Sequence, residues 1–131
     1  MGSPTLGPSP GNKQHPKHTI LISKSPFHWY VSLGQRSLAE SCDAYVLEEA
    51  EYPPVIYFPQ KDVSIELMQP SSTQTTCPFK GKAHYYAATI ENELADVAWY
   101  YPEVYDEVAE IAGLIAFDLN KVKLTGISQY D

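Results

Sequence analysis

One segment of the sequence alternates apolar and polar side chains with a period of two. In Phe27–Leu33 every second residue, starting with Phe27, is apolar. This is the period of a β-strand, because successive side chains of a strand point to opposite faces. Gly34-Gln35 then reads as a two-residue turn, and Arg36–Ala39 as the returning strand. The segment therefore predicts a β-hairpin and favours a fold built on β-sheets.

Other short segments have strand character and are separated by turn residues. Lys61–Gln69 also suits a helical turn, but its alternation favours a strand, and the Ser/Thr-rich stretch Pro70–Thr76 reads as a loop. We expect Val97–Tyr100 to pair back onto the strand before it, and Asp118–Lys121 to turn a final hairpin. The further predicted strands are Thr19–Ile22, Ala44–Glu48, Val55–Phe58, Lys82–Ile90, Val97–Tyr100, Leu114–Phe117 and Val122–Leu124.

One segment reads as a helix, Glu103–Ala112. It follows Pro102, begins with acidic residues, carries an apolar stripe that includes Val108, and ends before Gly113. Many short strands with one short helix predict a mainly β fold of small, twisted, antiparallel sheets.

The chain has 131 residues, which suits one domain. Residues 1–14 contain three prolines, three glycines and one large aliphatic side chain, Leu6, so they bury too little to offset the entropy of ordering. We predict a flexible N-terminal tail over residues 1–14 and a single β-rich domain over residues 15–131.

Charge and cysteine content restrict the partners and the compartment. Nine basic and sixteen acidic residues give a net charge of −7, the wrong sign for binding nucleic acid through its phosphates. We find no apolar stretch long enough to cross a membrane and no signal peptide, so we expect no membrane partner. Cys42 and Cys77 lie far apart in sequence and form no metal-binding pattern. A reduced, cytoplasmic protein is the expectation.

The densest chemical motif is Thr76-Cys77-Pro78-Phe79-Lys80-Gly81. Pro78 fixes its own φ, and Gly81 permits a backbone conformation that other residues resist, so the segment suits a tight turn. In this turn Lys80 could stabilise a Cys77 thiolate and make it a nucleophile. A free cysteine is more often a small buried apolar residue, so packing is the alternative role for Cys77.

Aromatic and acidic residues supply candidate pocket walls. Adjacent strand residues face opposite ways, so one of Tyr85 and Tyr86, and one of Tyr100 and Tyr101, can share a face with a ligand. Tyrosine and tryptophan walls with a few polar groups are common in small-molecule pockets, although they are equally common in cores. The histidines have no metal-ligand spacing, and we expect no metal and no cofactor. The candidate catalytic residues are Cys77, Lys80 and Glu48, and the candidate ligand-binding residues are Tyr57, Asp62, Tyr86, Trp99 and Tyr101.

These motifs, in this order, resemble the family called domain of unknown function 427, a family of small bacterial proteins that is sometimes labelled nucleotidyltransferase-like. The resemblance covers residues 15–124. It rests on the segments Ser37–Ser41, Val46–Glu48, Pro53-Pro54, Tyr57–Pro59, Asp62-Val63, Thr76–Ala83, Tyr85-Tyr86, Ala98–Pro102 and Ile111–Phe117.

The resemblance implies a fold similar to the β-tent group, in which two sheets meet at an angle. Better-known members of that group bind zinc through cysteine pairs, which this chain lacks, so the implied ligand position becomes a pocket without the metal. The resemblance brings no established activity. We do not adopt the nucleotidyltransferase label, because the chain has no D-x-D or D-x-E pair to hold magnesium against a triphosphate.

Two main hypotheses for function follow. In the first, the protein binds a small molecule, as a binding protein or an enzyme, where the Cys77–Gly81 turn meets Trp99 and Tyr101. In the second, it is a non-catalytic interaction module, and its sheet edges receive a partner strand or a second copy to form a homodimer. A redox role for Cys77 is a third hypothesis, and it would require Cys42 to approach in space.

Overall fold

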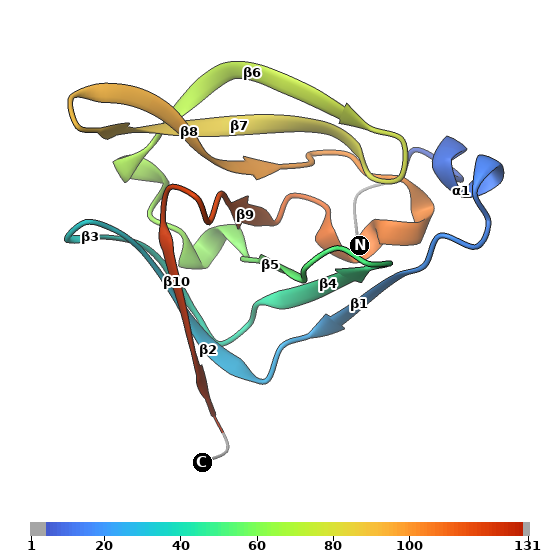
Figure 1. The fold of residues 1–131 in the computed structure, drawn as a ribbon, viewed down its shortest axis with the longest axis horizontal. Coiled ribbons are helices and arrows are strands. Elements are labelled where there is room, and N and C mark those ends of the chain that lie inside the picture. The colour runs from blue at the N-terminus through green and yellow to red at the C-terminus, as the bar shows by residue number, and fades with distance from the viewer. Residues whose placement is uncertain (1–4, 130–131) are drawn as a thin grey trace.

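The structure is a computed structural model that describes residues 5–129. Within that range ten strands form three small antiparallel sheets, which confirms the predicted mainly β fold (Figure 1). The first sheet has the order β1-β4-β5, the second β10-β2-β3 and the third β6-β7-β8-β9. The strands are β1 Ile20–Lys24, β2 Phe27–Leu33, β3 Arg36–Ser41, β4 Tyr45–Glu49, β5 Val55–Tyr57, β6 Gln69–Cys77, β7 Gly81–Ile90, β8 Glu93–Tyr100, β9 Ile115–Phe117 and β10 Lys123–Ser128.

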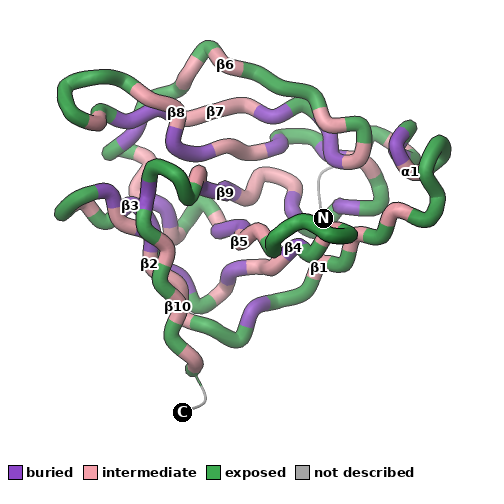
Figure 2. The backbone as a smooth tube through the Cα atoms, in the orientation of Figure 1, coloured by how far each residue is buried: buried purple, intermediate pink, exposed green. Residues whose placement is uncertain are grey.

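The first and third sheets are joined at the centre of the molecule. Phe58, just after β5, and Ile115 of β9 exchange backbone hydrogen bonds of 2.7 and 2.8 Å. All three residues of β9 are buried, and Figure 2 shows buried backbone where β5 and β9 meet. The four-stranded sheet therefore cannot separate from the first sheet without breaking this link.

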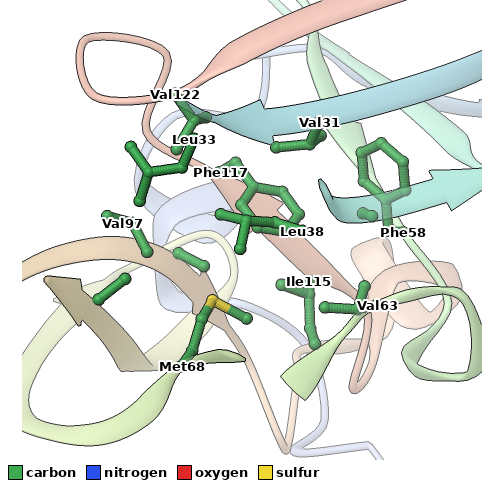
Figure 3. Close-up of a cluster of buried hydrophobic side chains, with 13 residues drawn as sticks. Val31, Leu33, Leu38, Phe58, Val63, Met68, Val97, Ile115, Phe117 and Val122 are labelled. Atoms are coloured by element: carbon green, nitrogen blue, oxygen red, sulfur yellow. The ribbon is translucent and has the colours of Figure 1, made fainter. Parts of the chain in front are cut away.

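Two hydrophobic clusters fill the space between the sheets. One lies between the second and third sheets and includes an edge-to-face pair of Phe58 and Phe117, with ring centroids 5.6 Å apart (Figure 3). The other lies between the first and third sheets and includes Leu47, Tyr57 and Tyr101. The second cluster forms the floor of the candidate site described below.

The predicted hairpin of β2 and β3 is confirmed, and β8 pairs with β7 as expected. Two predictions between residues 61 and 77 are wrong. Lys61–Gln69 overlaps the 3-10 helix Gln60–Asp62 and contains the 3-10 helix Ile65–Leu67, whereas the predicted loop Pro70–Thr76 belongs to strand β6. Threonine fits a pleated surface well, and β6 is an edge strand whose exposed side chains need not be apolar, so its polar sequence concealed a strand.

The C-terminal predictions also need correction. β10 pairs with β2, and β9 pairs with β8, so residues 114–124 do not form a hairpin. The predicted helix Glu103–Ala112 is a 3-10 helix, Asp106–Ile111, that is interrupted at Val108, where φ is −125° and ψ is 32°. Val108 and Ile111 are buried as the apolar stripe predicted. Their inward packing holds without the regular hydrogen bonds of an α-helix.

The predicted flexible tail falls partly outside the described residues, at residues 1–4, and residues 5–14 lie against the domain. They contain the α-helix α1, Pro10–Gln14, whose first turn is capped by the Ser9 hydroxyl accepting from the Asn12 amide at 3.0 Å. The Gly11 amide donates to the Pro78 carbonyl at 2.9 Å. Backbone hydrogen bonds to the domain therefore position a segment whose composition offered little apolar surface to bury. Among residues 5–129, none of the helices has the length and apolar content that crossing a membrane requires.

Candidate functional site

The Cys77–Gly81 turn joins β6 to β7 and fixes the position of Lys80. The Lys80 amide donates to the Cys77 carbonyl at 3.3 Å, and the Lys80 carbonyl accepts from the Tyr105 amide at 3.1 Å. Gly81 has φ of +141°, and a Cβ there would lie 2.7 Å from the Glu103 carbonyl oxygen. The turn is thus clamped against the segment that follows β8, and glycine is required where the two backbones meet.

Lys80 belongs to a chain of three polar side chains in which Glu49 is the middle member. Its Nζ lies 2.5 Å from Oε1 of Glu49, and the other oxygen of Glu49, Oε2, lies 2.7 Å from Nε2 of His18. The side chains are 10%, 14% and 19% exposed for Lys80, Glu49 and His18, respectively. The His18 ring in turn stacks on Phe79, with centroids 4.1 Å apart. Both oxygens of Glu49 are therefore occupied, and Glu49 holds the ammonium of Lys80 in place.

The environment of Glu49 favours its charged form. Burial raises the pKa of the Glu49 carboxyl, but the hydrogen bonds from Lys80 and His18 and the charges of both residues outweigh it, so the pKa lies below its usual 4.5. Glu49 is ionised at neutral pH.

This shift predicts a pH-dependent difference in stability. The folded pKa of Glu49 is lowered, so its contribution is complete above about 4.5 and is lost as the pH falls through the folded value. We expect the difference in unfolding free energy between wild type and Glu49→Gln to shrink as urea denaturation is repeated from pH 7 down to about pH 3. The carboxyl pKa values of Asp43 and Asp96 are also lowered, but their contributions to stability are the same in both proteins and cancel in this difference. Glu48→Gln is the control, and a wild-type-to-Glu49→Gln difference as flat as the control's would contradict the assignment.

Lys80 and Glu49 line a cavity of about 460 Å³ between the first and third sheets. Val55 and Tyr57 of β5 form one wall, and Tyr85 of β7 and Trp99 of β8 form the other. Tyr85 and Trp99 are direct cross-strand neighbours, with ring centroids 6.5 Å apart. The remaining lining residues are Thr73, Asp96, Ala98, Tyr101, Asp118 and Lys121. The cavity volume lies within the range of small-molecule sites.

Three tyrosines, Tyr57, Tyr85 and Tyr101, line the same cavity as Lys80. Burial raises the pKa of Tyr101, and the neighbouring Tyr57, Cys77, Tyr85 and Glu49 raise it further. Burial also raises the pKa of the Tyr57 phenol, although a hydrogen bond from the Trp99 side chain lowers it. Both phenols are therefore protonated at neutral pH and can donate hydrogen bonds.

A second cavity, of about 410 Å³, adjoins the first and is mainly apolar. The two share Glu49, Val55, Trp99 and Asp118, so Trp99 stands at the boundary between them. The other residues that line the second cavity are Tyr52, Pro53, Pro54, Ile56, Phe58, Phe117, Leu119 and Leu124. A ligand at Trp99 can thus extend from a polar compartment into an apolar one.

The first cavity, lined by Lys80 and Glu49, is called the polar cavity below. Its acidic residues are bonded to protein groups. Hydrogen bonds from Ser71 and then Thr73 lower the pKa of the Asp96 carboxyl, and the Thr73 hydroxyl lies 2.7 Å from Oδ2 of Asp96. Lys121 donates to the Asp96 carbonyl at 2.8 Å and lies 3.6 Å from Oδ2 of Asp118. These bonds fix the positions of Asp96, Asp118 and Lys121 in the lining of the cavity.

The structure brings four of the predicted site residues to this cavity, namely Tyr57, Lys80, Trp99 and Tyr101. Cys77 lies beside them, with its Sγ 3.9 Å from Nζ of Lys80, and it packs against the cluster under the cavity. Its half-buried position combines the two roles that the motif suggested, proximity to Lys80 and packing.

Three predicted site residues lie elsewhere. Glu48 is exposed, because β4 turns alternate residues inward and Leu47 occupies the inward face. Tyr86 points into the other cluster and stacks on Tyr100 at 5.3 Å. Asp62 belongs to a 3-10 helix, where it accepts from the Ser41 hydroxyl at 2.6 Å and from Lys61 at 2.9 Å.

We missed Glu49, His18 and Tyr85 as site residues. The alternation of side chains along a strand could have indicated Glu49, because Glu49 lies on the same face as Leu47, the more apolar face of the predicted strand. Tyr85 lies on the same face as Trp99, because the two residues pair directly across β7 and β8. His18 carries no signal in the sequence, because its approach to Glu49 depends on the pairing of β1 with β4.

The two cysteines predict different reactivity toward an alkylating reagent. Cys42 is exposed and Cys77 is half-buried, and both are free. Since access controls thiol reactivity, we expect native iodoacetamide labelling to modify Cys42 at least several-fold faster than Cys77. Mass spectrometry of tryptic peptides would give both rates in one sample, with the urea-unfolded chain as the reference for equal access. Faster labelling of Cys77 would instead support the hypothesis of an activated thiol.

No cluster of three or more histidine, cysteine, aspartate or glutamate residues suited to a metal ion occurs in the part of the chain that the structure describes. No curated protein matches the sequence. The family model described as a domain of unknown function, DUF427, matches residues 21–126. That range contains the Cys77–Gly81 turn, Glu49 and all four aromatic residues of the polar cavity, while His18 lies outside it. The chain therefore belongs to the DUF427 family.

Proposed function

We propose that this protein binds a small molecule in the polar cavity between β5 and the β7–β8 pair. The observation that carries the proposal is the almost fully buried Lys80, held by Glu49, in a cavity whose walls are Tyr57, Tyr85, Trp99 and Tyr101. Aromatic walls with a few fixed polar groups are the usual composition of a ligand site.

Stability alone gives little reason for such an arrangement. A buried ion pair is costly to desolvate, and apolar residues of similar volume often stabilise a fold as well or better. The Lys80–Glu49 pair stands beside a cavity, where a fixed ammonium and nearby phenols can contact a ligand. This supports a binding role for the cluster in addition to its packing role.

Of the candidate catalytic residues, Lys80 lines the cavity and Cys77 lies beside it, so any reaction at the site would use these two. Glu49 is less suited to act as a base, because both of its oxygens are bonded to cationic or potentially cationic groups. We propose a cytoplasmic location for this activity, which is supported by two cysteines that remain as free thiols.

The two tryptophans allow a direct test by NMR. Trp99 lines the cavity, whereas the Trp29 indole N–H donates to the Ser25 hydroxyl at 2.8 Å and lines neither cavity, which makes it an internal control. A fragment library titrated into ¹⁵N-labelled protein is expected to include compounds that shift the Trp99 indole resonance and leave that of Trp29 in place.

Variants on neighbouring residues then locate the binding. Tyr85→Phe removes the hydroxyl of a residue that lines the cavity, a hydroxyl that also lies 3.0 Å from the Thr75 hydroxyl, while Tyr86→Phe removes one from the opposite face of the same strand. We expect the first to weaken binding and the second to leave it unchanged. A library that shifts neither indole, or hits that respond equally to both variants, would refute the proposal.

The second candidate function is a homodimerising interaction module. The outer edge of β1 has no partner strand among the described residues, and Leu21 on β1 is 64% exposed. An open edge with an exposed leucine can pair with a second copy. Sedimentation analysis would support this function if the wild type dimerises at micromolar concentration and Leu21→Lys is a monomer. A wild-type monomer at every concentration would exclude it.

A further inference from the structure

We propose that the ligand is an uncharged molecule with a carbonyl group and an apolar ring or chain, such as an aromatic amide. Its carbonyl oxygen would accept hydrogen bonds at Lys80 and the tyrosines, and its apolar part would extend past Trp99 into the second cavity. This inference rests on the proposed function and specifies the class of ligand.

The Lys80 ammonium and the Tyr57 and Tyr101 phenols supply hydrogen-bond donors to the polar cavity. The Lys80 ammonium has three N–H groups, of which Glu49 takes one at 2.5 Å and the weakly accepting Cys77 sulfur lies near another at 3.9 Å. The buried phenols of Tyr57 and Tyr101 keep their protons. A ligand group that accepts hydrogen bonds satisfies these donors, whereas a group with only donors does not.

The carboxylates of the cavity already have partners. Glu49 accepts on both oxygens, from Lys80 and His18. The Asp96 carboxylate accepts from Thr73 and Ser71, and Asp118 accepts from the Asn120 amide at 3.0 Å and pairs with Lys121. A ligand ammonium would therefore have to compete with bonds that the protein makes to itself.

The charge balance argues against an anionic ligand. The cavity contains two cations, Lys80 and Lys121, and three anions, Glu49, Asp96 and Asp118. Each cation is within ion-pairing distance of one of the three carboxylates. The chain as a whole has a net charge of −7. A carboxylate would lose its hydration without gaining an unpaired cation, and that loss is costly.

The apolar cavity accounts for the rest of the ligand. Its lining includes Pro53, Pro54, Phe58 and Leu124, with Trp99 at the boundary to the polar cavity. A flat ring or short chain that enters from Trp99 would bury part of its apolar surface there, and burial of apolar area is the main source of affinity in such sites.

Three indole derivatives with the same apolar part separate the alternatives. Indole-3-acetamide carries a neutral carbonyl, indole-3-acetate an anion and tryptamine a cation. We expect the amide to bind at least about tenfold more tightly than either charged compound, which corresponds to roughly 1.4 kcal/mol. Dissociation constants would come from calorimetry or from the Trp99 indole shift, with Trp29 as the internal control.

Variants test whether the carbonyl contacts the predicted donors. Tyr101→Phe removes one donor and keeps the ring, so it should weaken amide binding severalfold, while Tyr86→Phe should not. Lys80→Met should weaken it further, with the exposed Lys82→Met as control. Because Lys80→Met leaves Glu49 unpaired and could unfold the protein, Tyr101→Phe provides the decisive comparison.

The outcomes distinguish the two proposals. If tryptamine or the acetate binds as tightly as the amide or more tightly, the ligand class is wrong but the binding function stands. Preference for tryptamine would indicate an aromatic cage that attracts cations. If none of the three binds while other fragments shift the Trp99 resonance, the ligand class is again wrong and the binding function again stands. If no compound shifts Trp99, the proposed function fails as well.

Discussion

Replacing Glu49 with glutamine is expected to lower the free energy of unfolding by roughly 3 kcal/mol at neutral pH. The substitution keeps the shape of the side chain but removes the charge that faces Lys80 at 2.5 Å. The ammonium would then be nearly buried without a counter-ion, which is far more costly than losing an exposed ion pair. Urea denaturation at pH 7 measures the change.

Glu48→Gln is the matched control, because it makes the same chemical change one residue away. Glu48 is exposed on the outer face of β4, so its loss should change stability by no more than about 0.5 kcal/mol. Equal effects of the two substitutions would mean that the Lys80–Glu49 pair contributes no more than a surface charge.

The second large effect is expected from Gly81→Ala, which should destabilise the fold by roughly 3 kcal/mol. Gly81 has φ of +141°, a conformation that residues with a side chain rarely adopt. The new Cβ would also lie 2.7 Å from the Glu103 carbonyl oxygen, a backbone atom that cannot rotate away. The backbone at residue 81 would have to move to relieve this contact. Because Lys80 precedes Gly81, the movement should weaken ligand binding as well as lower stability.

Gly34→Ala separates the two causes of this loss. Gly34 also has a positive φ, +61°, but no atom lies within 4 Å of the position that its Cβ would take. Only the backbone cost applies there, roughly 1 kcal/mol. Thermal and urea unfolding of both variants would measure the difference. Equal losses would show that the contact between Gly81 and Glu103 is loose enough to accept a methyl group.

Local patterns predicted the parts of the fold that depend on neighbouring residues. Alternation and a two-residue turn were sufficient for the β2–β3 hairpin, and the family motif marked Lys80 and Trp99, which the structure places in one cavity. The mainly β fold followed from the same short periods. In these cases the relevant contacts lie within one hairpin or one turn.

The predictions that were wrong depend on pairing that a segment's own sequence does not specify. β6 has a polar sequence and is a strand only because β7 supplies its hydrogen bonds. The β10 strand joins β2 rather than the adjacent β9, a choice that local periodicity does not specify. Within the site, strand parity relates Glu49 to Leu47, but the approach of His18 requires the register of β1 against β4.

The pairing of β10 with β2 has a consequence for how the chain folds. Ser128 lies opposite Phe27, so this ladder closes a loop that contains most of the domain. Closing a long loop costs entropy before the contacts that it brings together can repay it, and such non-local sheets fold on the order of milliseconds to seconds. Until β10 arrives, β2 has β3 on one side and an open edge on the other. The completed second sheet therefore forms late, and the unpaired edge of β2 is where an incompletely folded chain would associate with another copy.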